Sequence, residues 1–199
     1  MAEIISKDLD KRVERSRRHL MSALLELMQE SSYSKISVAQ ICERSGVARP
    51  TFYLHYRSKD DLLRGYIESM FIEFCEQIDV YLTAAPTADP KIAEIMFKQW
   101  SDKAVFAKLL VKDDIEALML AEFKRYVDHI IRRFIEAHKL PVRDNSMLPY
   151  VVDFLAGASF MVVVRWIKDD FPTDAKTMGE LYATLVRPGL LQVMLSGKL

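Results

Sequence analysis

The residues best suited to recognition chemistry lie in the stretch SGVARPTFYLHYRSKDDLL, residues 45–63. Arg49 carries a planar guanidinium that fits the O6 and N7 atoms of guanine. Thr51 offers a hydroxyl and a methyl group, and Pro50 offers a ring that can meet a thymine methyl. Pro50 also suits the first turn of a helix, where a missing N–H has no intrahelical partner. A helix built only to fill a core needs no such set. The stretch is compatible with contact to duplex DNA, and the alternative is a short surface helix that packs on a core.

Other polar residues nearby are suited to phosphate oxygens, which fix the register of a protein on DNA but carry little sequence information. Tyr53, His55 and Lys59 lie further along the same segment. A helix beginning after Ser37 would offer its free N–H groups to another phosphate. The predicted DNA-binding residues are Ser37, Ala48, Arg49, Pro50, Thr51, Tyr53, Leu54, His55 and Lys59.

Three helices are expected to position these residues. Apolar residues at helical spacing predict a first helix over about 9–31. Ser37 is a plausible N-cap for a second helix that ends at Ser45-Gly46, and a third covers about 49–56. Two short helices joined by a glycine turn form a helix-turn-helix, whose second helix enters the major groove.

The rest of the chain also follows helical periodicity. A capping box of Ser58 and Asp61 predicts the start of a long fourth helix, which stops at the linker TAAPTADP. Arg187-Pro188-Gly189 is expected to kink or split the last helix. Further helices are predicted over about 90–102, 103–111, 113–139, 147–168 and 174–195. No segment shows sustained period-two alternation, so the predicted fold is all-α.

The charge distribution supports two domains. The net charge of the chain is zero, but residues 1–64 carry 12 Lys and Arg against 9 Asp and Glu. A basic face on a small domain is compatible with DNA binding. We therefore expect a helix-turn-helix domain over residues 1–64 and a larger helical domain over residues 65–199. In the first helix, Lys11, Arg12, Arg15 and Arg18 either follow phosphates or keep the helix soluble.

The pattern ISVAQICERSGVARPTFYLHYRSKDDLL, residues 36–63, closely resembles the N-terminal domain of the TetR/AcrR family of bacterial transcription regulators. The resemblance covers about residues 9–65. The residues that carry it are Gly46, Val47, Thr51, Phe52, Tyr53, His55, Tyr56, Lys59, Leu62 and Leu63. Two positions depart from the family: Ala48 lacks the side-chain N-cap that many relatives have, and Ala39 replaces a residue that is often polar or basic.

The resemblance implies a homodimer that binds an inverted-repeat operator, with an effector pocket in the larger domain. It also implies repression more often than activation. The expected pocket, for a small apolar effector, is lined by Met70, Phe74, Phe97, Trp100, Phe106, Met119, Phe123 and His129. The expected dimer interface contains Phe154, Gly157, Met161, Leu181 and Leu185. An aromatic and methionine stripe of this kind is more often an ordinary core than a ligand site. For the last helices, the alternative to a dimer interface is a core within one chain.

Other classes of function find little support in the sequence. Two cysteines with 32 residues between them match no zinc spacing, and no metal or cofactor is expected. The chain lacks the common hydrolase, metalloprotease and nucleotide-binding motifs, which argues against an enzyme. Neither a signal peptide nor a membrane span is expected, so the predicted location is cytoplasmic. The alternatives kept open are a larger domain that binds a protein partner or acts as a coactivator, and a helical enzyme.

Overall fold

The computed structural model describes residues 2–84, 89–112, 115–140 and 146–195. Within these residues the regular elements are all helices, which confirms the predicted all-α fold. The chain divides into two compact units, Met1–Glu68 and Ser69–Leu199.

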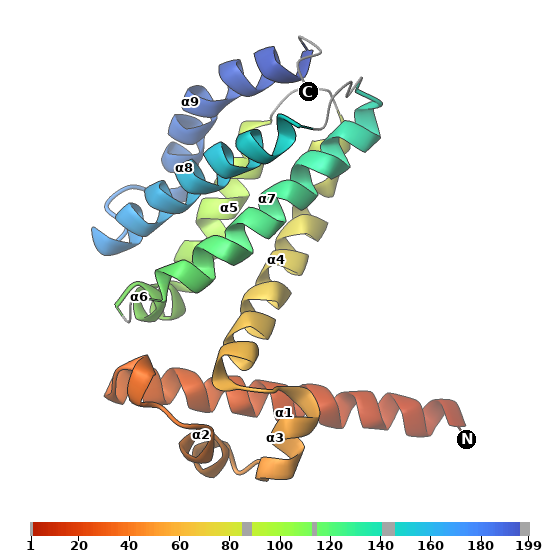
Figure 1. Ribbon diagram of the computed structural model, residues 1–199, viewed down its shortest axis with the longest axis vertical. Coiled ribbons are helices and arrows are strands. Elements are labelled where there is room, and N and C mark those ends of the chain that lie inside the picture. Colours follow the sequence, from red (N-terminus) through yellow and green to blue (C-terminus); the bar gives the residue numbers. More distant parts are fainter. Residues whose placement is uncertain (1, 85–88, 113–114, 141–145, 196–199) are drawn as a thin grey trace. The chain divides into compact units, whose positions relative to one another are not determined.

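The first unit contains the predicted helix-turn-helix (Figure 1). Its elements are α1 (Ala2–Glu30), the 3₁₀ helix η1 (Tyr33–Lys35), α2 (Val38–Ser45), α3 (Arg49–His55) and the first turns of α4 (Lys59–Ala84). The helix α1 begins at Ala2 rather than near residue 9, and η1 occupies the serine-rich break for which no structure was predicted. The remaining bounds agree with the sequence prediction to within three residues, close to the usual uncertainty of helix ends.

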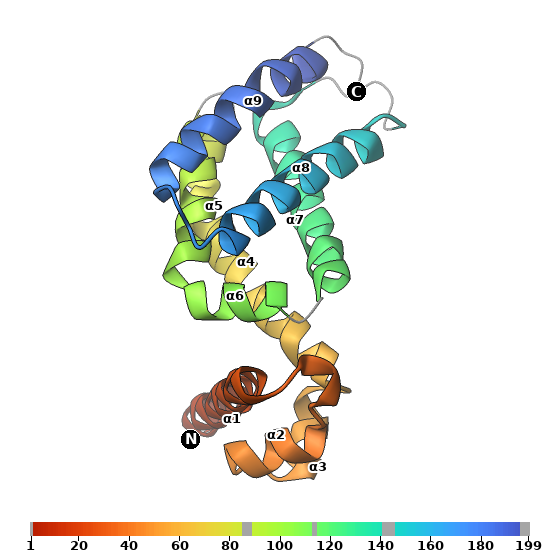
Figure 2. The ribbon, with the colours of Figure 1, turned by 90° about the vertical axis from the view of Figure 1, so that its left-hand side faces the viewer.

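Apolar residues at helical spacing form the core of the first unit. Leu20, Leu24 and Met28 follow one another at intervals of four on α1 and are completely buried. Phe52 of α3 is also completely buried, and α2 and α3 lie on the same side of α1 (Figures 1 and 2). Tyr56 packs on α4, because a Cβ added at Gly65 would lie 3.2 Å from its ring. Phe52 and Tyr56 therefore hold the recognition segment in place.

The second unit is a bundle of the remaining helices (Figure 2). It contains the rest of α4 with α5 (Pro90–Asp102), α6 (Ala104–Lys112), α7 (Glu116–His138), α8 (Leu148–Lys168) and α9 (Ala175–Leu195). The helix α9 packs on α5, and α8 packs on α7 and α6. The contact between α5 and α9 is very close at Gly179, where an added Cβ would lie 2.6 Å from the backbone nitrogen of Glu94.

Of the two outcomes predicted for Arg187-Pro188-Gly189, a split of the last helix is wrong, and a kink stays a prediction. The helix α9 runs as one element with Pro188 inside it. Proline removes only one backbone hydrogen bond, and it lies close to the C-terminal end of the helix.

The helix α8 is long and apolar enough to cross a membrane by length and composition alone, with a mean hydropathy of 1.6. Half of this segment is buried inside the second unit. One face carries core residues such as Val152 and Val163, whereas Phe154 and Met161 are exposed. A helix that is buried on one side is typical of the core of a folded domain, and the exposed apolar residues form a stripe on its other side.

Candidate nucleic-acid interface and effector cavity

The turn between α2 and α3 depends on glycine. Gly46 ends α2 with a φ of +67°, in the left-handed region that other residues rarely adopt. At the other end of α2, the Ser37 hydroxyl accepts a hydrogen bond from the Gln40 backbone N–H, and the Gln40 side chain accepts one from the Ser37 N–H. This capping box fixes the start of α2, so both ends of the helix are set by local sequence.

The exposed face of α3 carries most of the residues predicted to contact DNA. Arg49 and Tyr53 are four residues apart, as are Pro50 and Leu54, and all four are exposed. Leu54 is 81% exposed, which is unusual for a leucine in a helix of seven residues. Phe52 points the other way into the core. The helix therefore presents a mixed basic, aromatic and apolar face away from the unit that holds it.

The start of α3 matches the sequence prediction. Ala48 is the N-cap residue and provides no side-chain hydrogen bond, and Pro50 lies in the first turn. The backbone N–H groups of that turn are therefore not satisfied by a capping side chain. Such groups can be satisfied by water or by a ligand.

Salt bridges connect α2 to α1. Arg44 donates from both terminal nitrogens to the two carboxylate oxygens of Glu30, each at 2.8 Å, and also pairs with Glu26. The pair with Glu30 raises the pKa of Arg44 and lowers that of Glu30. The bidentate pair with Glu30 orients α2 relative to α1, and the single positive charge of Arg44 lies between two acidic side chains of α1.

His55 lies half-buried at the end of α3. Burial, with a smaller contribution from the Arg17 charge, lowers the pKa of His55 below its ordinary value. The imidazole is therefore neutral near pH 7 and can donate one hydrogen bond. Arg12, Arg15 and Arg18 of α1 are exposed, whereas the Lys11 side chain lies outside the described residues.

The structure gives Lys59 partners that the sequence did not indicate. Its ammonium donates to the backbone oxygens of Tyr33 at 2.6 Å and Ile36 at 2.8 Å, with Ser34 at 3.3 Å. It also lies 4.5 Å from the centre of the Tyr33 ring. The predicted phosphate contact therefore has to compete with contacts inside the protein.

The predicted capping box before α4 is only half formed. The Ser58 hydroxyl accepts from the Asp61 backbone N–H at 3.1 Å, as expected. The Asp61 carboxylate, however, accepts from the backbone N–H of Arg57 at 2.9 Å, one residue before the usual position. The start of α4 is thereby joined directly to the end of the recognition segment.

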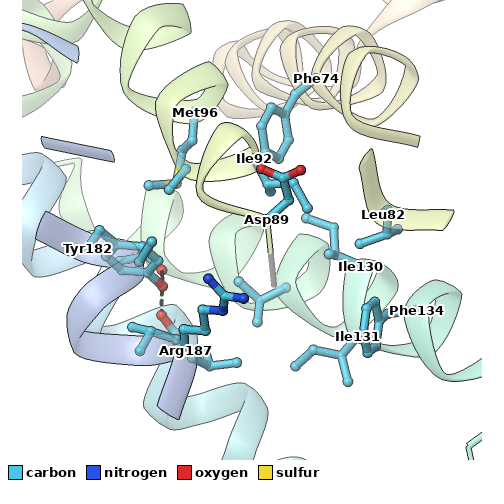
Figure 3. A pocket seen from close by; sticks show the side chains of 16 residues that line it. Phe74, Leu82, Asp89, Ile92, Met96, Ile130, Ile131, Phe134, Tyr182 and Arg187 are labelled. Atoms are coloured by element: carbon cyan, nitrogen blue, oxygen red, sulfur yellow. Dashed lines mark hydrogen bonds between the residues drawn. The ribbon is translucent and has the colours of Figure 1, made fainter. Parts of the chain in front are cut away.

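The second unit encloses an apolar cavity of about 150 Å³ (Figure 3). It lies among α4, α5, α7, α8 and α9. Its lining residues are Phe74, Leu82, Asp89, Ile92, Ala93, Met96, Val127, Ile130, Ile131, Phe134, Leu155, Ser159, Tyr182, Ala183, Val186 and Arg187. Figure 3 shows Tyr182 and Arg187 on one side of the cavity and Phe134 on the opposite side. Apolar walls with a few polar groups are typical of small-molecule sites.

Two polar side chains in the cavity wall, Ser159 and Tyr182, hydrogen-bond to each other. The Ser159 hydroxyl donates to the backbone oxygen of Leu155 at 2.6 Å. The Tyr182 hydroxyl therefore donates to the Ser159 oxygen, at 2.5 Å. Burial raises the pKa of Tyr182, so its proton is retained. The Tyr182 oxygen keeps lone pairs that can accept a hydrogen bond from a ligand.

The cavity is not where the sequence predicted a pocket. Of the eight predicted residues only Phe74 lines it. Six of the others fill the core of the second unit, namely Met70, Phe97, Trp100, Phe106, Met119 and Phe123. His129 is exposed. The aromatic residues pack on each other and leave no space between them for a ligand. The rings of Trp100 and Phe123, for example, are stacked with their centres 5.9 Å apart.

The predicted dimer residues form an exposed apolar surface on α8 and α9. Phe154 is 68% and Met161 65% exposed on α8, and Leu185 is 68% exposed on α9. Leu181 is also exposed, and a Cβ added at Gly157 would meet no atom within 4 Å. Both helices lie on the side of the second unit that faces the viewer in Figure 2.

Two family models match the chain. The model described as "Bacterial regulatory proteins, tetR family" matches residues 20–66, and that described as "Transcriptional regulator C-terminal region" matches residues 90–188. Together they cover well over half of the chain, including the helix-turn-helix and most of the residues that line the cavity. The chain belongs to the TetR family. It is a transcriptional regulator with a DNA-binding helix-turn-helix, and not an enzyme.

Individual TetR-family relatives are distant. The fatty acid metabolism regulator protein of Bacillus subtilis (strain 168) is 24% identical over 117 residues, which cover 58% of this chain and 60% of the relative. The chain spans between 30% and 60% of the length of the curated relatives it matches.

Solved TetR-family structures share the fold across the whole chain. A regulator from Syntrophomonas wolfei superposes with a TM-score of 0.65 at 14% identity, covering 94% of this chain and 97% of that one. The dihydroxyacetone kinase operon activator DhaS gives a TM-score of 0.60 at 17% identity, covering 90% and 97%. At these identities the likeness concerns the fold alone.

Proposed function

We propose that this TetR-family protein is a cytoplasmic, homodimeric repressor that binds an inverted-repeat operator and responds to a small apolar effector. The exposed face of α3 is the observation that carries the DNA-binding part. In the proposal, Arg49, Pro50 and Thr51 face base edges. Tyr53 and His55 contact phosphates, and the capped start of α2 at Ser37 adds another contact. The name of DhaS shows that a similar fold also serves activation.

The apolar stripe on α8 and α9 supports the homodimer. In a twofold dimer the same patch occurs in both subunits and covers itself. Phe154, Met161, Leu181 and Leu185 are large, apolar and exposed on the isolated chain. The open space above Gly157 allows close approach of a partner helix. A twofold dimer presents two copies of α3, which is why the operator is proposed to be an inverted repeat.

Selection of bound duplexes from a random pool tests the DNA-binding proposal. We expect the wild-type protein to enrich an inverted repeat and its affinity to fall steeply with salt. Enrichment of a single half-site, or of no sequence by a folded dimer without effector, would contradict the proposal. A reporter gene placed behind the selected repeat then distinguishes repression from activation, because the protein lowers expression in the first case and raises it in the second.

The cavity supports an effector with a compact apolar part. Its volume of about 150 Å³ equals that of engineered apolar cavities that bind benzene. The Tyr182 oxygen can accept from a hydroxyl or protonated carboxyl group, and the Arg187 guanidinium can pair with a carboxylate. The Bacillus subtilis relative is named a fatty acid metabolism regulator protein. We therefore propose fatty acids and the matching alcohols as the first compounds to test for binding.

Filling the cavity is expected to abolish the effector response. Ala183 lines the cavity and is half-buried, so Ala183→Leu adds three carbon atoms to the space a ligand would occupy. We expect the thermal stabilisation caused by a binding fatty acid or alcohol to disappear, while operator binding without ligand persists. Ala121→Leu, on an exposed site of α7 outside the cavity lining, is the control. Equal stabilisation of the Ala183 variant and the control would place the effector elsewhere.

A further inference from the structure

The turn that follows α1 is connected to the start of α4 by three neighbouring side chains. Lys59 donates to the backbone oxygens of Tyr33, Ser34 and Ile36. The Tyr33 hydroxyl donates to the Asp60 carboxylate at 2.5 Å. An ammonium has three N–H donors, and here each has a carbonyl within hydrogen-bonding distance.

Local helix electrostatics do not explain a lysine at this position. Lys59 is the first residue of α4, where the helix macrodipole disfavours a positive charge. Asp60 and Asp61, the next two residues, have the charge that this end of a helix favours. The carbonyl oxygens of η1 and the face of the Tyr33 ring provide the compensating negative potential for Lys59.

The backbone oxygens that Lys59 binds lie directly before the helix-turn-helix. Ile36 immediately precedes Ser37, the N-cap of α2, so its carbonyl lies at the entry to the helix-turn-helix. At the other end of the motif, the Asp61 carboxylate accepts from the N–H of Arg57, just after α3. The first turn of α4 therefore holds the segment before α2 and the segment after α3.

We propose that Lys59 is a positioning residue for DNA binding: its ammonium binds the η1 carbonyls, not a phosphate, and fixes the entry to α2 against the start of α4. The proposal rests on DNA binding by the helix-turn-helix. Lys59 thus contributes to affinity by holding α2 and α3 in their reading geometry. Its charge is used inside the protein, so the number of phosphates that the protein neutralises does not depend on it.

The salt dependence of DNA binding separates positioning from phosphate contact. Each lost phosphate contact reduces the slope of log K against log salt by about 0.9. A random-sequence duplex is a suitable probe, because phosphate contacts do not depend on sequence. Measurements well below the Tm of each variant keep every molecule folded, so a lysine that only stabilised the fold would leave the affinity unchanged.

For Lys59→Met we expect a lower Tm, about tenfold weaker binding in the folded state, and an unchanged salt slope. Lys59→Arg is expected to lose affinity in the same way, because a planar guanidinium cannot reproduce three converging bonds from one nitrogen. Lys35→Met, which removes an exposed cation from the same turn, is the control for charge and should leave the Tm unchanged.

Three results would overturn the proposal. They are a smaller salt slope with an unchanged Tm in Lys59→Met, wild-type affinity in that variant, and wild-type affinity in Lys59→Arg. If Lys59→Met does not fold, Tyr33→Phe tests the second link between this turn and the start of α4, since it removes the bond to Asp60 and keeps the Lys59 ammonium. It should lower both the Tm and the affinity at constant slope. The Tm measurements remain decisive for the contact itself even if the wild-type protein binds no DNA.

Discussion

Arg49→Ala is expected to lower operator affinity by about 2–6 kcal/mol, or roughly 30-fold to 10⁴-fold. Arg49 is exposed in the first turn of α3, where a recognition helix approaches base edges. A bidentate contact with one guanine contributes about 1–3 kcal/mol, and a homodimer carries the substitution twice. The measurement is a titration of the selected inverted repeat with each protein at one fixed salt concentration.

The base preference of the Arg49→Ala variant shows whether Arg49 contacts a base. Repeating the duplex selection with Arg49→Ala should relax the preference at one position in each half-site and leave the other positions unchanged. Arg132→Ala is the control: this exposed arginine of α7 forms an i,i+4 pair with Asp128 and lies outside the first unit. Loss of affinity without any change in base preference would assign Arg49 to a phosphate instead.

Phe154→Lys is expected to convert the dimer into a folded monomer. Phe154 is exposed near the middle of the apolar stripe of α8, so the substitution leaves the packing of the isolated chain intact. In a twofold interface the two lysines would lose water and approach each other. We expect dimerisation to weaken by about 4 kcal/mol or more, on the order of a thousandfold. Sedimentation equilibrium measures the change directly.

The matched control for this experiment is Val105→Lys. Val105 is a similarly exposed apolar residue, but it lies on α6 outside the stripe. It should remain a dimer and bind the operator as the wild type does. The Phe154 variant should keep its helical circular dichroism and lose most of its operator affinity, because its two half-site contacts are no longer joined. A dimer that persists in Phe154→Lys would exclude α8 as the interface.

The sequence by itself determined the helices and the recognition segment. These features depend on residues close together in the chain: the spacing of Leu20, Leu24 and Met28, the Ser37 cap and the glycine turn at Gly46. The exposed face of α3 follows from the same local geometry, because residues four apart share one side of a helix. Local periodicity and capping also predicted the bounds of the helices in the second unit to within about three residues.

Only the tertiary structure decided where the cavity lies and what Lys59 does. An apolar stripe at helical spacing can fill a core or line a cavity, and the packing of five helices determines which, as Phe97 and Phe134 show. Lys59 meets carbonyls that lie 23 to 26 residues earlier in the chain. Backbone carbonyls leave no mark on the sequence, because every residue has one, so folding alone brings this lysine to its partners.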